Sequence, residues 1–145
     1  MTNGDILTIY TDGASRGNPG AAAWAFVVVQ DGSIVESQTG YLGRATNNVA
    51  EYHAVINALT EARKHTGGTV VVHSDSELVV RQLTGQYRIR KEHLAELHQK
   101  VLQRAAAFKA VSFVSVPREH PCIRIADRLC NETLDTYGGA QRRHD

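Results

Sequence analysis

Apolar and β-branched residues fall into short segments bounded by turn-forming residues in the first third of the chain. Residues 7–11 alternate in the manner of a strand, and 23–29 is an apolar run suited to a central strand. Between them lies DGASRGNPG, a small-residue stretch that we interpret as a wide turn after a strand ending at Asp12. The sequence QDGS at 30–33 then indicates a hairpin into a third antiparallel strand at 34–42. These segments predict a three-stranded meander.

The apolar period then changes to that of an amphipathic helix. Asn47 is the predicted N-cap of this helix and Gly67 its stop. Beyond it the pattern predicts, in order, a strand at 69–75, a short helix at 76–85, a helix at 92–108, a strand at 111–117 and a helix at 124–135.

Strands that are joined through helices run parallel, so the order βββαβααβα predicts an α/β fold with a mixed sheet. A right-handed crossover would return strand 69–75 beside strand 7–11, pointing the same way. Ligands of such sheets bind at the carboxyl ends of the strands where the order reverses. Asp12 and Asp75 stand at those ends.

A length of 145 residues suits one compact domain, which we predict over 1–137 and follow with a loose polar tail over 138–145. No stretch is apolar enough to span a membrane and no apolar leader precedes the first strand. The sequence therefore predicts a cytoplasmic protein without membrane contact. We expect a monomer with no obligatory protein partner.

The net charge of +1 hides a basic segment, because residues 81–109 carry seven Lys or Arg against two Glu. Such a strip favours a polyanionic partner only weakly, since solvated helices carry similar charges. Cys122 and Cys130 lack the spacing of a zinc site, and we interpret them as reduced core thiols. A disulfide between them stays an alternative hypothesis.

Four acidic residues are the candidate chemistry of the chain. The predicted topology brings Asp12 and Asp75 to one sheet edge, and Glu51 lies at the border of the buried stripe of the first helix. Asp127 lies early in the last predicted helix, at the border of the apolar stripe of that helix. Each alone has a structural interpretation as a turn, helix cap or solvated residue. Together they would repel unless two divalent cations bridged them, and oxygen ligands favour Mg²⁺ or Mn²⁺.

The motifs YTDGASRGNPG, TNNVAEYHA, HSDSELVVRQL, a strand ending in VP, and ADRL follow one another in an order and spacing that resemble type 1 ribonuclease H over residues 6–135. The resemblance implies a ribonuclease H-like five-stranded sheet of order 3-2-1-4-5. Strands 1–3 would be antiparallel, strands 1, 4 and 5 parallel, and about four helices would flank the sheet. It places the catalytic, metal-binding carboxylates at Asp12, Glu51, Asp75 and Asp127.

The activity implied is endonucleolytic hydrolysis of the RNA strand of an RNA/DNA hybrid, leaving 5′-phosphate and 3′-hydroxyl ends. Two Mg²⁺ ions, with Mn²⁺ as an alternative, would activate the water and stabilise the leaving oxygen. By resemblance, Asp12 bridges both ions and Asp127 completes the nucleophile side. Two other hypotheses stay open: an inactive nucleic-acid-binding module of this fold, and a nuclease of this fold that acts on DNA.

The resemblance also implies a set of residues that contact the hybrid. The 2′-hydroxyls would be sensed in the minor groove, Thr46 would bind a DNA phosphate, and a short basic connector would hold the DNA strand. The predicted set is Ser15, Asn18, Thr46, Asn47, Asn48, Ser76, Glu77, Arg88, Arg90 and Lys91.

The chain departs from the family pattern at two places. The basic, Trp-containing helix of many members is reduced to GQYRIRKEH, so we predict a compact form lacking the full basic protrusion. The Gly-His pair that often follows VP is replaced by Arg118 and Glu119. Glu119 is either a mobile metal-attracting group or a partner of Arg118, and His120 is interpreted as an exposed loop residue.

Overall fold

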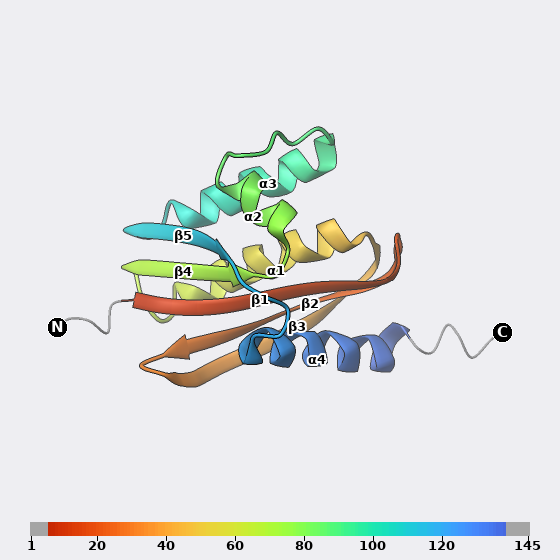
Figure 1. Cartoon of the computed structure of the whole chain (residues 1–145), viewed down its shortest axis with the longest axis horizontal. Helices are drawn as coiled ribbons and strands as arrows, with labels where there is room; N and C mark the ends of the chain where they lie inside the picture. The colour runs from red at the N-terminus through yellow and green to blue at the C-terminus, as the bar shows by residue number, and fades with distance from the viewer. Residues whose placement is uncertain (1–5, 139–145) are drawn as a thin grey trace.

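The computed structural model describes residues 6–138, which form one five-stranded sheet with helices on both faces (Figure 1). The sheet order is β3-β2-β1-β4-β5, with β1–β3 antiparallel and β4 and β5 parallel to β1, so the predicted topology is confirmed. The elements are β1 (Ile6–Gly17), β2 (Gly20–Gln30), β3 (Ser33–Ala45), α1 (Asn47–Ala62), β4 (Thr69–Ser74), α2 (Glu77–Leu83), α3 (Glu92–Ala105), β5 (Ala110–Ser115), α4 (Pro121–Thr133) and a π-helical turn (Leu134–Gly138).

The first strand is longer than predicted, and the prediction that it ends at Asp12 is wrong. Its ladder with β2 continues through the glycine-rich stretch to the pair Gly17–Gly20, so only Asn18 and Pro19 form the turn. Small side chains allow this stretch to remain paired. The parallel ladder with β4 stops earlier, at Thr11–Ser74. Asp12 therefore stands in mid-strand, one residue beyond the point where the neighbour on one side ends.

The second hairpin has the geometry that its sequence predicts. Asp31 and Gly32 connect β2 to β3 and both have positive φ, 54° and 79°. Two positive φ angles match a type I′ turn, whose twist suits the flanking strands.

Two apolar clusters lie on opposite faces of the sheet. On one face α1 packs on β1 and β2, while α3 packs on α1. On the other face α4 covers β1, β2 and β3, through Ala126, Cys130 and Leu134 against small residues of β2 (Figure 1). The π-helical turn that follows α4 also packs on β2 and β3 on this face.

Two helix starts differ from the predictions. Thr46, rather than Asn47, caps α1, because its Oγ1 accepts a hydrogen bond from the Val49 backbone N–H at 3.3 Å. α4 begins at Pro121 instead of residue 124, since Pro suits the first helical turn and His120 caps it. Asp127 consequently lies in the second turn of α4.

The remaining sequence predictions concern the thiols, the membrane and the tail. Cys122 and Cys130 are free, as predicted: they lie on one helix about 12 Å apart, too far for a disulfide. None of the helices within residues 6–138 is long and apolar enough to cross a membrane. Gly138 is buried beside Ala21, and the rest of the predicted tail, 139–145, lies outside the described residues.

Candidate active site

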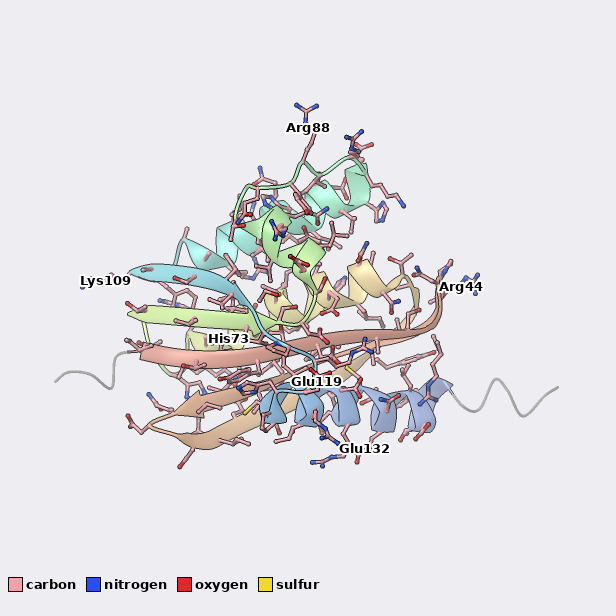
Figure 2. All side chains as sticks on the ribbon, in the orientation of Figure 1. Arg44, His73, Arg88, Lys109, Glu119 and Glu132 are labelled. Atoms are coloured by element: carbon pink, nitrogen blue, oxygen red, sulfur yellow. The ribbon has the colours of Figure 1, made fainter. Side chains whose placement is uncertain are left out.

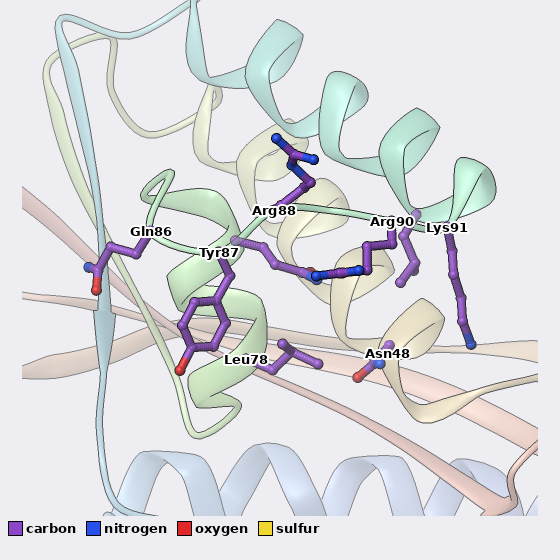
Figure 3. A pocket seen from close by; sticks show the side chains of 9 residues that line it. Asn48, Leu78, Gln86, Tyr87, Arg88, Arg90 and Lys91 are labelled. Carbon is purple, nitrogen blue, oxygen red and sulfur yellow. The ribbon is translucent and has the colours of Figure 1, made fainter.

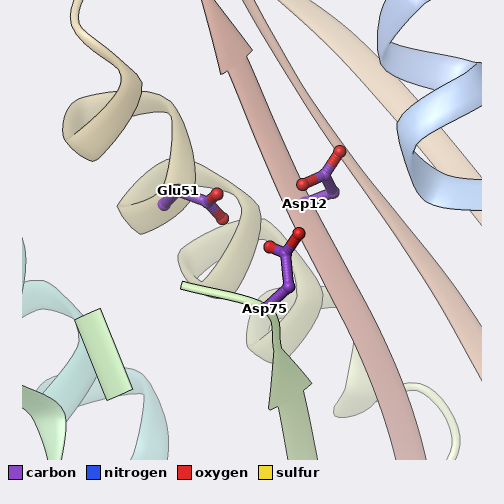
Figure 4. Close-up of side chains that lie close together, drawn as sticks. All are labelled: Asp12, Glu51 and Asp75. Carbon is purple, nitrogen blue, oxygen red and sulfur yellow. The ribbon is translucent and has the colours of Figure 1, made fainter. Parts of the chain in front are cut away.

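Three carboxylates from different elements meet at one edge of the sheet. Asp12 comes from β1, Glu51 from the first turns of α1, and Asp75 from the end of β4; one oxygen of each lies within 4.8 Å of the others (Figure 4). Asp12 and Glu51 are only 5% and 8% exposed. The predicted convergence of these three residues is therefore present in the structure.

A close approach of β1 to α1 brings Glu51 to this position. A Cβ built on Gly13 would lie 2.3 Å from the Ala50 carbonyl carbon and 2.4 Å from the Glu51 backbone nitrogen. Both are backbone atoms, so no side-chain movement can relieve the overlap. Gly13 thus allows the strand that carries Asp12 to contact the helix that carries Glu51.

Replacing Gly13 by Ala is expected to destabilise the protein by more than about 3 kcal/mol, because overpacking against backbone forces the helix away from the strand. Chemical denaturation measures the effect. Gly67→Ala is the matched control, since the nearest atom to its Cβ, Arg63 Nη1, is 3.9 Å away. Equal denaturation midpoints for the two variants would contradict this account of the strand–helix contact.

Burial and mutual repulsion raise the pKa values of two carboxyl groups in this cluster. Desolvation, followed by the charges of Asp75 and Asp127, raises the pKa of Asp12 from 3.8 to about 8. Desolvation, followed by the charges of Asp12 and Asp75, raises the pKa of Glu51 well above its ordinary value, against hydrogen bonding from the Gly13 backbone. Within residues 6–138, Asp12 Oδ2 and Glu51 Oε1 are buried without a hydrogen-bond partner. Oxygens of this kind are what hard divalent cations coordinate, so the site fits Mg²⁺ or Mn²⁺.

Asp127 and Arg118 complete the wall of the same cavity. The cavity has a volume of about 440 Å³, and both residues line it together with the three clustered carboxylates. Arg118 Nε lies 3.6 Å from Asp75 Oδ2, so Arg118 pairs with Asp75 instead of Glu119. Sequence reasoning missed this contact, because the pairing depends on how the connector after β5 crosses the sheet edge. Glu119 lies at that crossing and borders a neighbouring groove with Asp127 (Figure 2).

Most of the residues predicted to line the minor groove of the hybrid surround the acidic cavity. Ser15, Asn47, Asn48 and Ser76 line it. Asn18 lies beside them, since its Oδ1 accepts a hydrogen bond from the Asn47 backbone N–H at 3.0 Å. Glu77, the sixth residue predicted to line this groove, does not line the cavity and pairs with Arg81 at 2.6 Å. Thr46, which was predicted to bind a DNA phosphate, caps α1.

A second cavity, of about 460 Å³, adjoins the first. Arg90, Lys91 and the backbone of the α2–α3 connector border it, and Leu78 and Tyr87 contribute apolar surface (Figure 3). Arg88 also lines it but its side chain projects outward (Figure 2). Asn48 lines both cavities, so the acidic cavity and this basic groove are contiguous.

The interpretation of His120 as an exposed loop residue is wrong. Its side chain is half-buried, and its Nδ1 accepts a hydrogen bond from the Cys122 backbone N–H at 3.1 Å, which caps α4. The ring also stacks on Tyr10, with ring centroids 4.5 Å apart. A residue distant in sequence supplies that partner, so the local pattern could not reveal it.

Sequence comparison finds similar proteins over most of the chain. A family model described as "Reverse transcriptase-like" matches residues 10–133. The chain is 36% identical over 131 residues to the bifunctional protein Rv2228c of Mycobacterium tuberculosis, covering 89% of this chain and 35% of that protein. It is 42% identical over 133 residues to ribonuclease HI of Halobacterium salinarum, covering 91% and 66%. The chain thus spans between about one third and two thirds of the length of these curated relatives.

Solved structures show the same similarity in three dimensions. The N-terminal RNase H domain of Rv2228c matches with a TM-score of 0.88 at 34% identity, covering 94% of this chain and 98% of that one. RNase H1 of Halobacterium salinarum matches with a TM-score of 0.85 at 40% identity, covering 90% and 98%. LC11-RNase H1, solved in complex with an RNA/DNA hybrid, matches with a TM-score of 0.83 at 38% identity, covering 90% and 97%.

Proposed function

Because the chain belongs to the type 1 ribonuclease H family, we propose that it is an endonuclease that hydrolyses the RNA strand of RNA/DNA hybrids. The products would carry 5′-phosphate and 3′-hydroxyl ends. One observation carries the proposal: carboxylates of Asp12, Glu51 and Asp75 converge within 4.8 Å, and within residues 6–138 a buried oxygen of Asp12 and one of Glu51 lack a hydrogen-bond partner. An arrangement that is unfavourable without cations has a reason to exist in a metal-dependent nuclease.

Asp12, Glu51, Asp75 and Asp127 would hold two divalent cations, which we propose to be Mg²⁺ with Mn²⁺ as a substitute. When bound, such a pair supplies an activated water and stabilises the charge on the leaving 3′-oxygen. The protein contributes rigid placement, because β1, β4 and α1 fix their carboxylates through the sheet ladder and the Gly13 contact. Cation binding requires ionised ligands, so it must displace the protons that burial retains on Asp12 and Glu51.

The two adjoining cavities suggest how the chain would select a hybrid. The RNA strand would cross the acidic cavity, where Asn18, Asn47 and Asn48 lie within reach of 2′-hydroxyls. The DNA strand would follow the basic groove along Arg90 and Lys91. Asn48, which lines both cavities, would stand between the strands.

The test offers end-labelled RNA with Mg²⁺ as hybrid, single strand and RNA duplex, alongside a DNA duplex. Cleavage of the hybrid alone, with 5′-phosphate and 3′-hydroxyl products, is the expected result. Binding without cleavage would instead support an inactive nucleic-acid-binding module, and equal cleavage of DNA would support a DNA-acting nuclease of the same fold.

Replacing Arg88, Arg90 and Lys91 together by Ala is expected to weaken hybrid binding and leave kcat unchanged, because these residues lie outside the acidic cavity. The slope of log affinity against log salt should fall by about 0.8 for each lost phosphate contact. Fluorescence anisotropy over a salt series measures it. Lys109→Ala is the control, since Lys109 lies at the opposite end of the strands (Figure 2). An unchanged slope in the triple variant would exclude the groove from hybrid binding.

A single domain over 1–137, a monomeric state, the absence of an obligatory partner and a cytoplasmic location stay predictions from the sequence. The proposed activity refers to this chain, which matches only part of the longer Rv2228c protein.

A further inference from the structure

Three aromatic rings form a continuous stack beside the acidic cavity. Tyr10 lies between His73 and His120, with ring centroids 4.6 Å and 4.5 Å apart and interplanar angles of 16° and 24°. Tyr10 and His73 are cross-strand partners on β1 and β4, while His120 precedes the first residue of α4. The stack therefore connects the two central strands to the start of the helix on that face.

Each ring belongs to a segment that carries a site residue. Tyr10 precedes Asp12 by two positions on β1 and so points to the same face of the sheet. His73 stands two positions before Asp75 (Figure 2). His120 follows Arg118 by two positions and opens the helix that carries Asp127.

Hydrogen bonds to a residue before His120 and to a residue after it fix the position of the His120 ring. His120 Nδ1 accepts from the Cys122 N–H at 3.1 Å, and the His120 N–H donates to the Pro117 carbonyl at 3.1 Å. The connector before it is tied to β4, since the Val116 N–H donates to the Ser74 carbonyl at 3.0 Å. A ring held this firmly can transmit the position of Tyr10 to the start of α4.

Asp127 differs from the other carboxylates in what holds it. Asp12, Glu51 and Asp75 are placed by the β1–β4 ladder and the contact of Gly13 with α1. Asp127 depends on the packing of α4, which contacts the sheet through the buried residues Ala126 and Cys130, with Ile125 and Leu129 partly buried beside them. The aromatic stack adds a contact between large rings at the N-terminal end of α4, where His120 caps the helix.

We propose that the His73–Tyr10–His120 stack is a positioning device that sets the distance between α4 and the sheet and so holds Asp127 against the acidic cluster. None of the three rings lines the acidic cavity, so their effect is exerted through Asp127 and the neighbouring Arg118. The kinetic part of this inference rests on the proposed function, whereas its metal-binding part does not.

Variants that separate the ring from its other roles test the proposal. Tyr10→Phe keeps the ring, while Tyr10→Val removes it from a strand position that Val suits. His120→Phe keeps the stack and loses the cap, while His120→Asn keeps the cap and loses the stack. We expect Tyr10→Val and His120→Asn to lower kcat by about threefold to tenfold with KM unchanged, and the two Phe variants to stay within about twofold of wild type. Loss of kcat in His120→Phe but not in His120→Asn would show that only the cap matters and would overturn the proposal.

A double-mutant cycle without nucleic acid gives the second readout. Isothermal titration calorimetry with Mn²⁺ should show weaker binding in Tyr10→Val by about threefold or more, and no further weakening by Tyr10→Val when Asp127→Asn is already present. Equal weakening in both backgrounds, or none in either, would contradict positioning through Asp127. His120→Asn repeats the cycle and guards against misfolding of the strand variant. A wild-type chain that fails to cleave hybrid would refute the proposed function, yet this cycle would still decide the role of the stack.

Discussion

Replacing Asp12 by Asn is expected to abolish hydrolysis of the RNA strand, with a loss in kcat of at least about a thousandfold. Asp12 belongs to the three-residue cluster, and the neighbouring charges of Asp75 and Asp127 both raise its pKa. Removing its charge would weaken the hold on both cations, and their stabilisation of the transition state amounts to several kcal/mol, with about 1.4 kcal/mol for each factor of ten. Single-turnover cleavage of a labelled hybrid measures the loss.

The same substitution should raise the melting temperature of the metal-free protein. Without cations, Asp12 is a buried acid next to Glu51 and Asp75, and the amide removes both its desolvation cost and its repulsion. Asp31→Asn is the matched control, because Asp31 lies in the β2–β3 turn with φ of 54°, a conformation that Asn also tolerates. The control should retain activity and stability. Full activity in Asp12→Asn would remove the basis of the proposed function.

The metal-free protein should lose stability as the pH rises from 6.5 to 8. The pKa of Asp12 is raised to about 8 in the folded state from an ordinary 3.8, so in this window the folded state retains a proton that the unfolded state has released. Stability therefore falls with pH, by about 1.4 kcal/mol per pH unit for each retained proton, and is lost as the pH passes the folded pKa. The raised pKa of Glu51 acts in the same direction. Asp12 alone accounts for about 2 kcal/mol, or about 5 °C in melting temperature for a chain of this size.

Thermal melts in a chelator at several pH values measure this slope. His53 and His73 have lowered pKa values in the folded state, so near pH 6.5 they oppose this slope: their unfolded imidazoles still hold about half a proton each there, and this contribution fades as the pH approaches 8. Adding Mg²⁺ at pH 8 should restore stability by about 2.7 kcal/mol at one hundred times its dissociation constant, because the cation binds only the folded site. Asp12→Asn should flatten the pH dependence. A metal-free wild type whose stability is constant or rises over this range would contradict the raised pKa values.

The local sequence pattern was sufficient to predict most strands and helices. It failed where contacts between distant residues determine the local structure. The hairpin at Asp31 and Gly32 was predictable, since a type I′ turn selects residues that tolerate positive φ. The glycine-rich stretch after Asp12 was not, because it has the composition of a turn and remains strand only through its pairing with β2. The N-cap of α1 fell on Thr46 for a similar reason: several polar residues in a row offer equivalent caps, and the tertiary position of the helix selects one of them.

The candidate site likewise contains residues whose positions could be predicted and contacts that could not. Asp12, Glu51 and Asp75 could be brought together from sequence, because strand order and helix periodicity restrict where each side chain points. The contacts of Arg118 with Asp75 and of His120 with Tyr10 join residues more than 40 positions apart in sequence, and no periodicity encodes such pairs.

Local apolar periodicity and motif order were enough to predict the order of strands and helices, the class of fold and the identity of the acidic residues. The closeness of the carboxylates, their burial and the contacts of His120 at the start of α4 became visible only in three dimensions. Those properties arise from packing between distant segments, and this packing raises the pKa of Asp12 and leaves its Oδ2 without a hydrogen-bond partner among residues 6–138.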